Sequence, residues 1–214
     1  LTGSGVFAHG APVNGAVITI VPAGSAGTLT VRKGINCPSS RLITNNETNL
    51  TMLQFMMNAS SVENITVSSV EFAASGSGNE PYDVSAVKLY KDVNANGALD
   101  AGVDVVIDQT GKTYAADNGT IVFDGLTQSI SAGQTVYWIL VYDMNSKALN
   151  GEAFAVSIAS SAGITAAGAV SSQSITAYEL PVNGNEMTVF LDEHSRSVGP
   201  KGCFIKTILT KNEK

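Results

Sequence analysis

Charged residues are scarce in this chain of 214 residues. They make up 14% of it, well below the roughly 25% of an average soluble domain. Acidic residues outnumber basic ones, so the net charge is −6 at pH 7 and the isoelectric point is near 4.8. Nucleic acids and anionic membrane surfaces both select basic faces, so we expect neither as a partner.

Long apolar runs are absent as well. No stretch approaches the ~18 apolar residues of a membrane-spanning helix, so no transmembrane segment is expected. The longest apolar block is VYWILVY at 136–142, which has the length of a buried strand. The sequence starts at Leu1 rather than at Met, which fits both an export signal already removed and a trimmed sequence.

Residues suited to catalysis are few. The two histidines, His9 and His194, lie in Gly-rich or polar segments outside the predicted core. The chain contains no GxSxG, HExxH, P-loop or CxxCH motif. The DEHS stretch at 192–195 places an acid, a base and a hydroxyl side by side, but neighbours in sequence rarely have triad geometry. We therefore do not expect an enzyme.

The two cysteines, Cys37 and Cys203, lie far apart in the sequence. A single disulfide between them would suit a secreted protein, and closing so long a loop would stabilise the fold by ~3–5 kcal/mol. Two buried free thiols fit almost as well. Both alternatives stay open from the sequence.

Alternating apolar and polar residues dominate what is present. Segments rich in Val, Ile, Thr and aromatic residues are separated by Gly, Asn, Asp and Ser, at a spacing typical of an antiparallel β-sandwich. The stretch 47–58 also has an apolar stripe at helical spacing, but its β-like flanks favour a strand. The sequence therefore predicts an all-β protein with strands at 16–21, 28–33, 50–57, 65–72, 85–90, 103–108, 120–125, 134–143, 152–159, 174–178 and 186–191.

The two ends differ in composition from the middle of the chain. Residues 1–27 form a Gly- and Ala-rich extension that contains a candidate donor strand, AVITIV at 16–21. Residues 28–191 are assigned to the sandwich. Residues 192–214 form a polar linker followed by a last strand-like segment, CFIKTILT at 203–210.

An oxygen-rich loop follows the predicted strand at 85–90. Calcium prefers six to eight oxygen ligands on a sharply turning loop, and the EF-hand pattern places them at positions 1, 3, 5, 7, 9 and 12 around a glycine at 6. Here Gly97 falls at position 6, and the carbonyl of Ala98 falls at position 7. We predict a structural Ca²⁺ site with the ligands Asp92, Asn94, Asn96, Ala98, Asp100 and Asp104.

The loop departs from that pattern at its end. Position 12 is Val103, and the carboxylate comes one residue later, at Asp104. Strands rather than helices are expected on both sides of the loop. Asp and Asn also favour turns through hydrogen bonds to their own backbone, so a solvated hairpin loop is the alternative.

The loop resembles the calcium loops of dockerins and other extracellular calcium modules. A wider pattern carries a second resemblance: a TVSS strand, then D-SAVKLY-D-N-NG--D, then ADNGT--F-GL---I-AG, and an apolar strand ending in YD. Over residues 28–160 this is similar to a recurrent bacterial and archaeal cell-surface module. The resemblance implies an Ig-like β-sandwich in secreted or assembled surface proteins, and it implies no reaction.

Five N-x-S/T sequons occur, and four of them lie between residues 46 and 66. They are glycan acceptors if the host glycosylates exported proteins, and ordinary turn asparagines otherwise. The candidate glycosylation sites are Asn46, Asn49, Asn58, Asn64 and Asn118.

Two hypotheses for function follow. The first is an extracellular structural subunit, stabilised by calcium, whose partners are copies of itself in a surface filament or layer built by donor-strand exchange. The second is a carbohydrate-binding or adhesive module of a larger secreted surface protein, whose partners are surface glycans.

Overall fold

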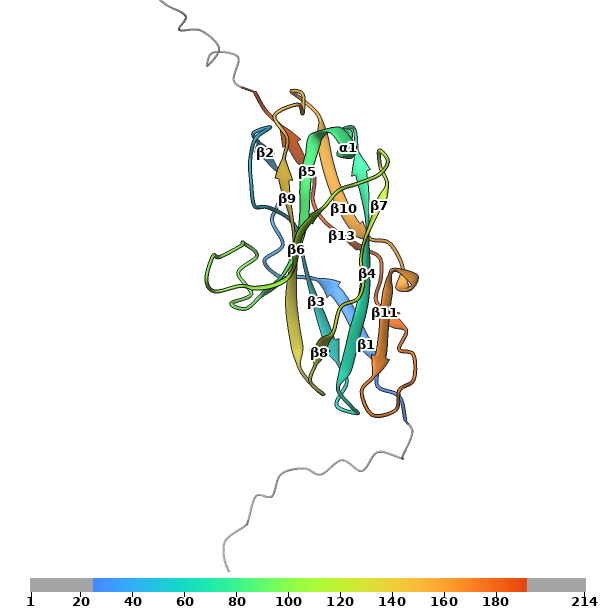
Figure 1. Ribbon diagram of the computed structural model, residues 1–214. Helices are drawn as coiled ribbons and strands as arrows, with labels where there is room; N and C mark the ends of the chain where they lie inside the picture. Colours follow the sequence, from blue (N-terminus) through green and yellow to red (C-terminus); the bar gives the residue numbers. More distant parts are fainter. Residues whose placement is uncertain (1–24, 192–214) are drawn as a thin grey trace, which may run out of the picture.

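The computed structural model describes residues 25–191, which form two β-sheets packed face to face (Figure 1). The predicted strands at 16–21 and 203–210, His9, His194 and Cys203 lie outside the described residues. Within the described range, no helix is long and apolar enough to cross a membrane.

The first sheet, called sheet A, has six strands. From one edge to the other they are β12 (Ala177–Tyr178), β1 (Leu29–Lys33), β3 (Leu50–Ala59), β9 (Thr135–Met144), β5 (Val84–Asp92) and β6 (Val105–Lys112). β3 and β9 pair over almost their whole length, and β9 pairs with β5 on its other side. β6 pairs with β5 alone, so it forms one edge of the sheet.

The second sheet, called sheet B, is built around the long strand β4. Its main path is β11 (Ile164–Gly168), β4 (Ile65–Gly76), β10 (Ala153–Ile158), β14 (Met187–Val189) and β2 (Arg41–Ile43). Three further strands pair with members of this path: β7 (Thr120–Phe123) and β8 (Gln128–Ile130) with β4, and β13 (Val182–Asn183) with β10.

The predicted all-β sandwich is confirmed, and the stretch 47–58 forms a strand from Leu50 onward, β3. Most pairs are antiparallel, but β1–β12 and β14–β2 are parallel. Parallel neighbours need a long connection, and these pairs join parts of the chain that are far apart in sequence. The short elements that the sequence did not predict are β2, β8, β11, β13, the helix α1 (Glu80–Asp83) and the 3₁₀ turn η1 (Ser161–Gly163).

Aromatic rings join the two sheets at the centre of the core. Phe55 on β3 contacts Trp138 on β9 edge to face, with ring centroids 5.9 Å apart. It also contacts Phe72 of the opposite sheet at 5.7 Å, and Phe72 in turn contacts Phe123 at 5.9 Å. All four side chains are essentially buried. Such pairs add to the free energy of burial, so this cluster holds the sheets in register.

A second apolar cluster lies on the outer face of sheet A. It comprises Tyr90 on β5 with Ile139 and Val141 on β9, and Leu99 from the loop after β5 packs against it. Ile139 and Val141 are fully buried although they do not face the main core. This cover explains why 136–142 is continuously apolar instead of alternating, because β9 is buried on both faces.

Candidate calcium loop

The predicted loop connects the end of β5 to the start of β6 and projects from the side of the sandwich, in green in Figure 1. Its sharp turn depends on Gly97, which has φ +80°, a conformation that other residues adopt only with strain. A Cβ atom there would lie 1.8 Å from the carbonyl oxygen of Asn36. Glycine is therefore required at this position for both backbone angle and space.

Asp92 is the buried end of the loop, with 2% of its surface exposed. Its Oδ1 accepts a hydrogen bond from the backbone N–H of Asn96 at 3.2 Å. Its Oδ2 accepts one from the N–H of Gly97 at 2.9 Å and one from the side-chain amide of Gln54 at 2.7 Å. These donors fix the orientation of the first predicted ligand.

Asp104 closes the other end of the loop. Its Oδ1 accepts from the N–H of Val93 at 3.0 Å, and its Oδ2 accepts from the N–H of Asp100 at 2.8 Å. Asp104, which lies one residue after position 12 of the EF-hand pattern, therefore contacts Val93, the second residue of the loop. This contact brings the two ends of the loop together.

Asp100 lies between the two asparagines of the loop. The amide nitrogens of Asn94 and Asn96 donate to its Oδ2 at 2.8 and 2.6 Å. Asn94 Oδ1 accepts from the N–H of Asn96, and Asn96 Oδ1 accepts from the N–H of Ala98. The structure thus gathers the side chains of Asp92, Asn94, Asn96, Asp100 and Asp104 in one network.

The charge of the loop is not balanced by neighbouring cations. Among residues 25–191, no lysine or arginine forms an ion pair with Asp92, Asp100 or Asp104, because the ion pairs there involve other acids: Glu47, Asp108, Asp124, Asp143 and Glu179. Nor do three acidic, histidine or cysteine side chains of this range converge closely enough to hold a metal by themselves. A cation here would also need amide and backbone carbonyl oxygens.

Gln54 contacts the predicted site and was not predicted from the sequence. It is fully buried on β3, between the apolar neighbours Leu53 and Phe55. Its Nε2 donates to Asp92 and its Oε1 accepts from the N–H of Asn36 at 2.9 Å. The signal in the sequence was a single amide within the apolar stretch LTMLQFMM, and buried amides are nearly always hydrogen-bonded.

The turn before β2 approaches the same amide closely. A Cβ atom at Gly34 would lie 2.2 Å from Gln54 Oε1, so this turn needs glycine. On the same side, the Asn36 side chain donates to the carbonyl of Ala95 at 2.7 Å. The loop is therefore attached to β3 through Gln54 and to the 34–37 turn through Asn36.

Cys37 lies in that turn and is half-buried. Its sulfur accepts a hydrogen bond from the N–H of Gln54 at 3.4 Å, and burial raises the pKa of its thiol. Cys203, its predicted disulfide partner, lies outside the described residues, so the pairing stays a prediction.

The sequon asparagines lie mainly at the surface. Asn46, Asn49, Asn64 and Asn118 are exposed or partly exposed, and Asn58 is half-buried. The Asn58 amide already donates to Thr135 Oγ1 at 2.8 Å, which makes it the least accessible of the five. Glycosylation itself stays a prediction.

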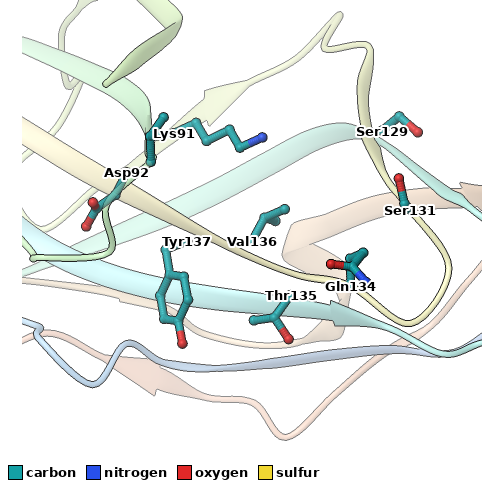
Figure 2. Close-up of a pocket in the computed structure, with 9 residues that line it drawn as sticks. Lys91, Asp92, Ser129, Ser131, Gln134, Thr135, Val136 and Tyr137 are labelled. Carbon is teal, nitrogen blue, oxygen red and sulfur yellow. The ribbon is translucent and has the colours of Figure 1, made fainter. Parts of the chain in front are cut away.

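A polar pocket of about 270 Å³ lies where β5 leaves sheet A, next to the loop (Figure 2). Lys91, Ser129, Ser131, Gln134 and Tyr137 are among its lining residues. In Figure 2 the amino group of Lys91 extends toward the two serines, whereas the carboxylate of Asp92 points away from them. The pocket and the predicted calcium loop thus adjoin at Asp92 but face different directions.

Comparisons with known proteins assign no family to the chain. No family model and no curated protein sequence match it. The similar solved structures include the sixth cohesin of scaffoldin B from Acetivibrio cellulolyticus, in complex with a dockerin (10% identity, TM-score 0.27, covering 78% of this chain and 100% of that one).

Two others are the seventh ScaB type I cohesin from Pseudobacteroides cellulosolvens (12% identity, TM-score 0.28, covering 82% and 97%) and BslA, a bacterial hydrophobin (9%, 0.24, covering 77% and 92%). Similarity at this level carries no argument about function. The fold rests on the strand pairings, and the function has to be argued from the residues described above.

Proposed function

We propose that this protein is an extracellular structural subunit that assembles with copies of itself at a cell surface, and that Ca²⁺ bound in the 92–104 loop stabilises it. The observation that supports this most is the loop itself. Five oxygen-bearing side chains are held there in one hydrogen-bonded network, with no basic side chain paired to its three carboxylates within the described residues.

The donor set fits calcium better than the other common metals. The loop offers carboxylate, amide and carbonyl oxygens, the ligands that hard cations prefer, and it contains neither histidine nor cysteine. In the structure, amide N–H groups of Asn94 and Asn96 face Asp100. A cation would take the place of those N–H groups and would be held by Asp92, Asn94, Asn96, Asp100, Asp104 and the carbonyl of Ala98.

Thermal unfolding with and without calcium tests this part of the proposal. Calcium at 100 times its dissociation constant would stabilise the folded chain by about 2.7 kcal/mol, which raises Tm by roughly 5–10 °C at this size. EDTA should reverse the rise. Asp100→Asn should abolish most of it, because the substitution removes a charge but keeps the shape of the side chain. Asp117→Asn, on an exposed loop elsewhere, is the control and should respond to calcium like the wild type. Identical melting curves in calcium and EDTA would reject the site.

The arrangement of the ends supports assembly. The described chain begins at one end of the sandwich, before β1, and finishes at the opposite end, after β14 (Figure 1). A sandwich whose first and last described strands end at opposite poles suits a head-to-tail chain. The sheet edges also carry backbone N–H and C=O groups that a strand of another subunit can pair with.

Deletion of residues 1–21 tests this second part. The deletion removes the candidate donor strand AVITIV and leaves every described strand in place. We expect a folded monomer that still responds to calcium, whereas the full chain forms filaments or larger assemblies visible by electron microscopy. A full chain that remains monodisperse at high concentration would refute self-assembly. A deletion that unfolds the protein would refute exchange through this segment.

The polar pocket of Figure 2 favours a second candidate, a carbohydrate-binding or adhesive module. It offers hydroxyl, amide and ammonium groups, which can form hydrogen bonds with sugars. Glycan-array binding would test it. Lys91→Ala should abolish binding if the pocket is the site, while Val170→Ala, an exposed substitution outside the pocket, should not.

A further inference from the structure

The strand β6 is the longest open edge among the described strands. Four of its eight residues pair with β5 on one side, with two register shifts between them, and sheet A ends there. Other edge strands are shorter: β12 has two residues, β2 and β8 have three, and β7 has four. β11 has five residues, and its outer side is bridged between Ala167 and Ser174.

The first three residues of β6, 105–107, lack the features that usually protect an edge. Natural edge strands carry charges, proline or inward-pointing polar groups that prevent pairing with other chains. The charges of β6 are at its fourth residue, Asp108, and its last residue, Lys112, whose charged groups are 3.9 Å apart. The start of the strand instead exposes apolar side chains: Val105 is 54% and Val106 43% exposed, next to Val103 at 48%.

A recess with a mixed lining adjoins this edge. It has a volume of about 310 Å³, with Tyr90, Leu99 and Val106 as its large apolar side chains and Asn49, Asp100, Asp104 and Gln109 as its polar ones. A strand laid beside β6 would place every second side chain on this face of the sheet. The recess is therefore placed to receive one apolar side chain of such a strand.

We propose that the outer edge of β6 is the acceptor onto which residues 16–21 of a second copy add as a strand. This rests on the self-assembly proposed above and assigns its acceptor. The segment AVITIV is uncharged and β-branched, and its six residues would extend about 20 Å, a length that the eight-residue edge can accommodate. Ile18 and Ile20 share one face of such a strand, so either can enter the recess.

The segment of the same subunit is a poorer occupant. In sheet A, β1 is separated from β6 by β3, β9 and β5, a distance of about 19 Å at the usual strand spacing. To reach β6 in its own subunit, the chain before β1 would have to cross the outer face, where the loop packs on Ile139 and Val141. A second copy can approach the edge from outside without crossing that face.

A complementation experiment on the full-length chain tests the assignment. One variant damages the acceptor (Val105→Lys with Val106→Lys) and the other damages the donor (Ile18→Lys with Ile20→Lys). Each alone should raise the concentration required for assembly by at least about tenfold, because lysine disfavours edge pairing. A 1:1 mixture should form dimers of twice 22.1 kDa, measured by light scattering, and nothing larger, because only one productive donor and acceptor remain.

The controls separate this proposal from self-assembly in general. Val122→Lys, an exposed valine of β7, should leave assembly unchanged. If the acceptor variant assembles like the wild type, β6 is not the acceptor although self-assembly stands. A mixture that stays monomeric, with both variants folded by circular dichroism, overturns the pairing of 16–21 with β6. A wild-type chain that never assembles overturns both proposals.

Discussion

Two buried glutamates in the connections of sheet B have pKa values that are shifted in opposite directions. Glu63 is 6% exposed, and its carboxylate accepts hydrogen bonds from the N–H groups of Gly27, Val170 and Ser171 and from the Ser171 hydroxyl. The Ser171 contacts, ahead of the others, lower the pKa of Glu63 to about 2. The surrounding loop closes tightly, since a Cβ at Gly168 would lie 2.1 Å from Glu63 Oε1.

Glu80, the first residue of α1, is fully buried but has far fewer donors. Its Oε2 accepts one hydrogen bond, from the N–H of Asn118 at 2.8 Å, and its Oε1 has no hydrogen-bond partner among the described residues. Burial raises the pKa of Glu80, the Asn118 N–H partly opposes the rise, and the negative charge of Asp117 adds to it. Comparison with Glu63 shows that the supply of N–H donors, and not burial alone, decides which form of a carboxyl group is stable.

Substitution of Glu63 should have the largest effect on stability. Glu63→Ala leaves three backbone N–H groups and one hydroxyl without their acceptor, so we expect Tm to fall by roughly 5–10 °C. Glu63→Gln keeps one acceptor oxygen, so its Tm should fall by less. Thermal unfolding at pH 7 measures both. An unchanged Tm for the alanine variant would show that this carboxylate does not hold the 168–173 loop.

The pH dependence should follow from the lowered pKa of Glu63. The unfolded chain protonates this group near pH 4.5 and the folded chain near pH 2, so its contribution is complete above about pH 4.5 and is lost as the pH falls toward 2. Acid unfolding of the wild type should therefore be steeper over this window than that of Glu63→Gln. Parallel curves for the two proteins would contradict the assignment.

The contribution of Glu80 to stability should change with pH in the opposite direction. Because its folded pKa is raised, the unfolded chain releases this proton more readily, and the folded state loses stability as the pH rises above about 4.5. Glu80→Gln cannot ionise, so its Tm relative to the wild type should improve by a few degrees between pH 4.5 and pH 8. The Tm of Glu63→Gln, measured in parallel, should fall relative to that of the wild type as the pH rises from 2 to 4.5. A Glu80→Gln difference that does not depend on pH would show that the pKa of Glu80 is not raised in the folded state.

The sequence predicted the regular parts of the molecule better than its polar interior. Alternation identified β3, β4 and β5, and a continuous apolar block identified β9, because each has at least one face in a continuous core. Spacing identified the loop network, since its members lie within thirteen residues and are brought together by a local turn. The short strands β2, β8, β11 and β13 were missed because two to five residues do not establish a period.

The roles of Gln54, Glu63 and Glu80 could not be predicted in the same way. Each depends on a partner that is distant in sequence: Asp92 for Gln54, the 168–173 loop for Glu63, and Asn118 for Glu80. Glu63, in the stretch SVEN, has the local sequence of a solvated turn. Only the packing of β4 against β11 brings the two segments together and buries it.

The smallest expected effect concerns the tyrosine pair near Glu80. Tyr114 and Tyr142 are buried, and their hydroxyl oxygens lie 2.5 Å apart. Burial raises the pKa of both hydroxyls, so both stay protonated and one donates to the other. Tyr114→Phe leaves the Tyr142 hydroxyl without this partner and should cost about 1 kcal/mol, or roughly 2–4 °C in Tm. The double variant with Tyr142→Phe removes both hydroxyls and should recover part of that loss, because no buried polar group is then left unpaired. If the two single losses simply add in the double variant, the hydroxyls do not interact in solution.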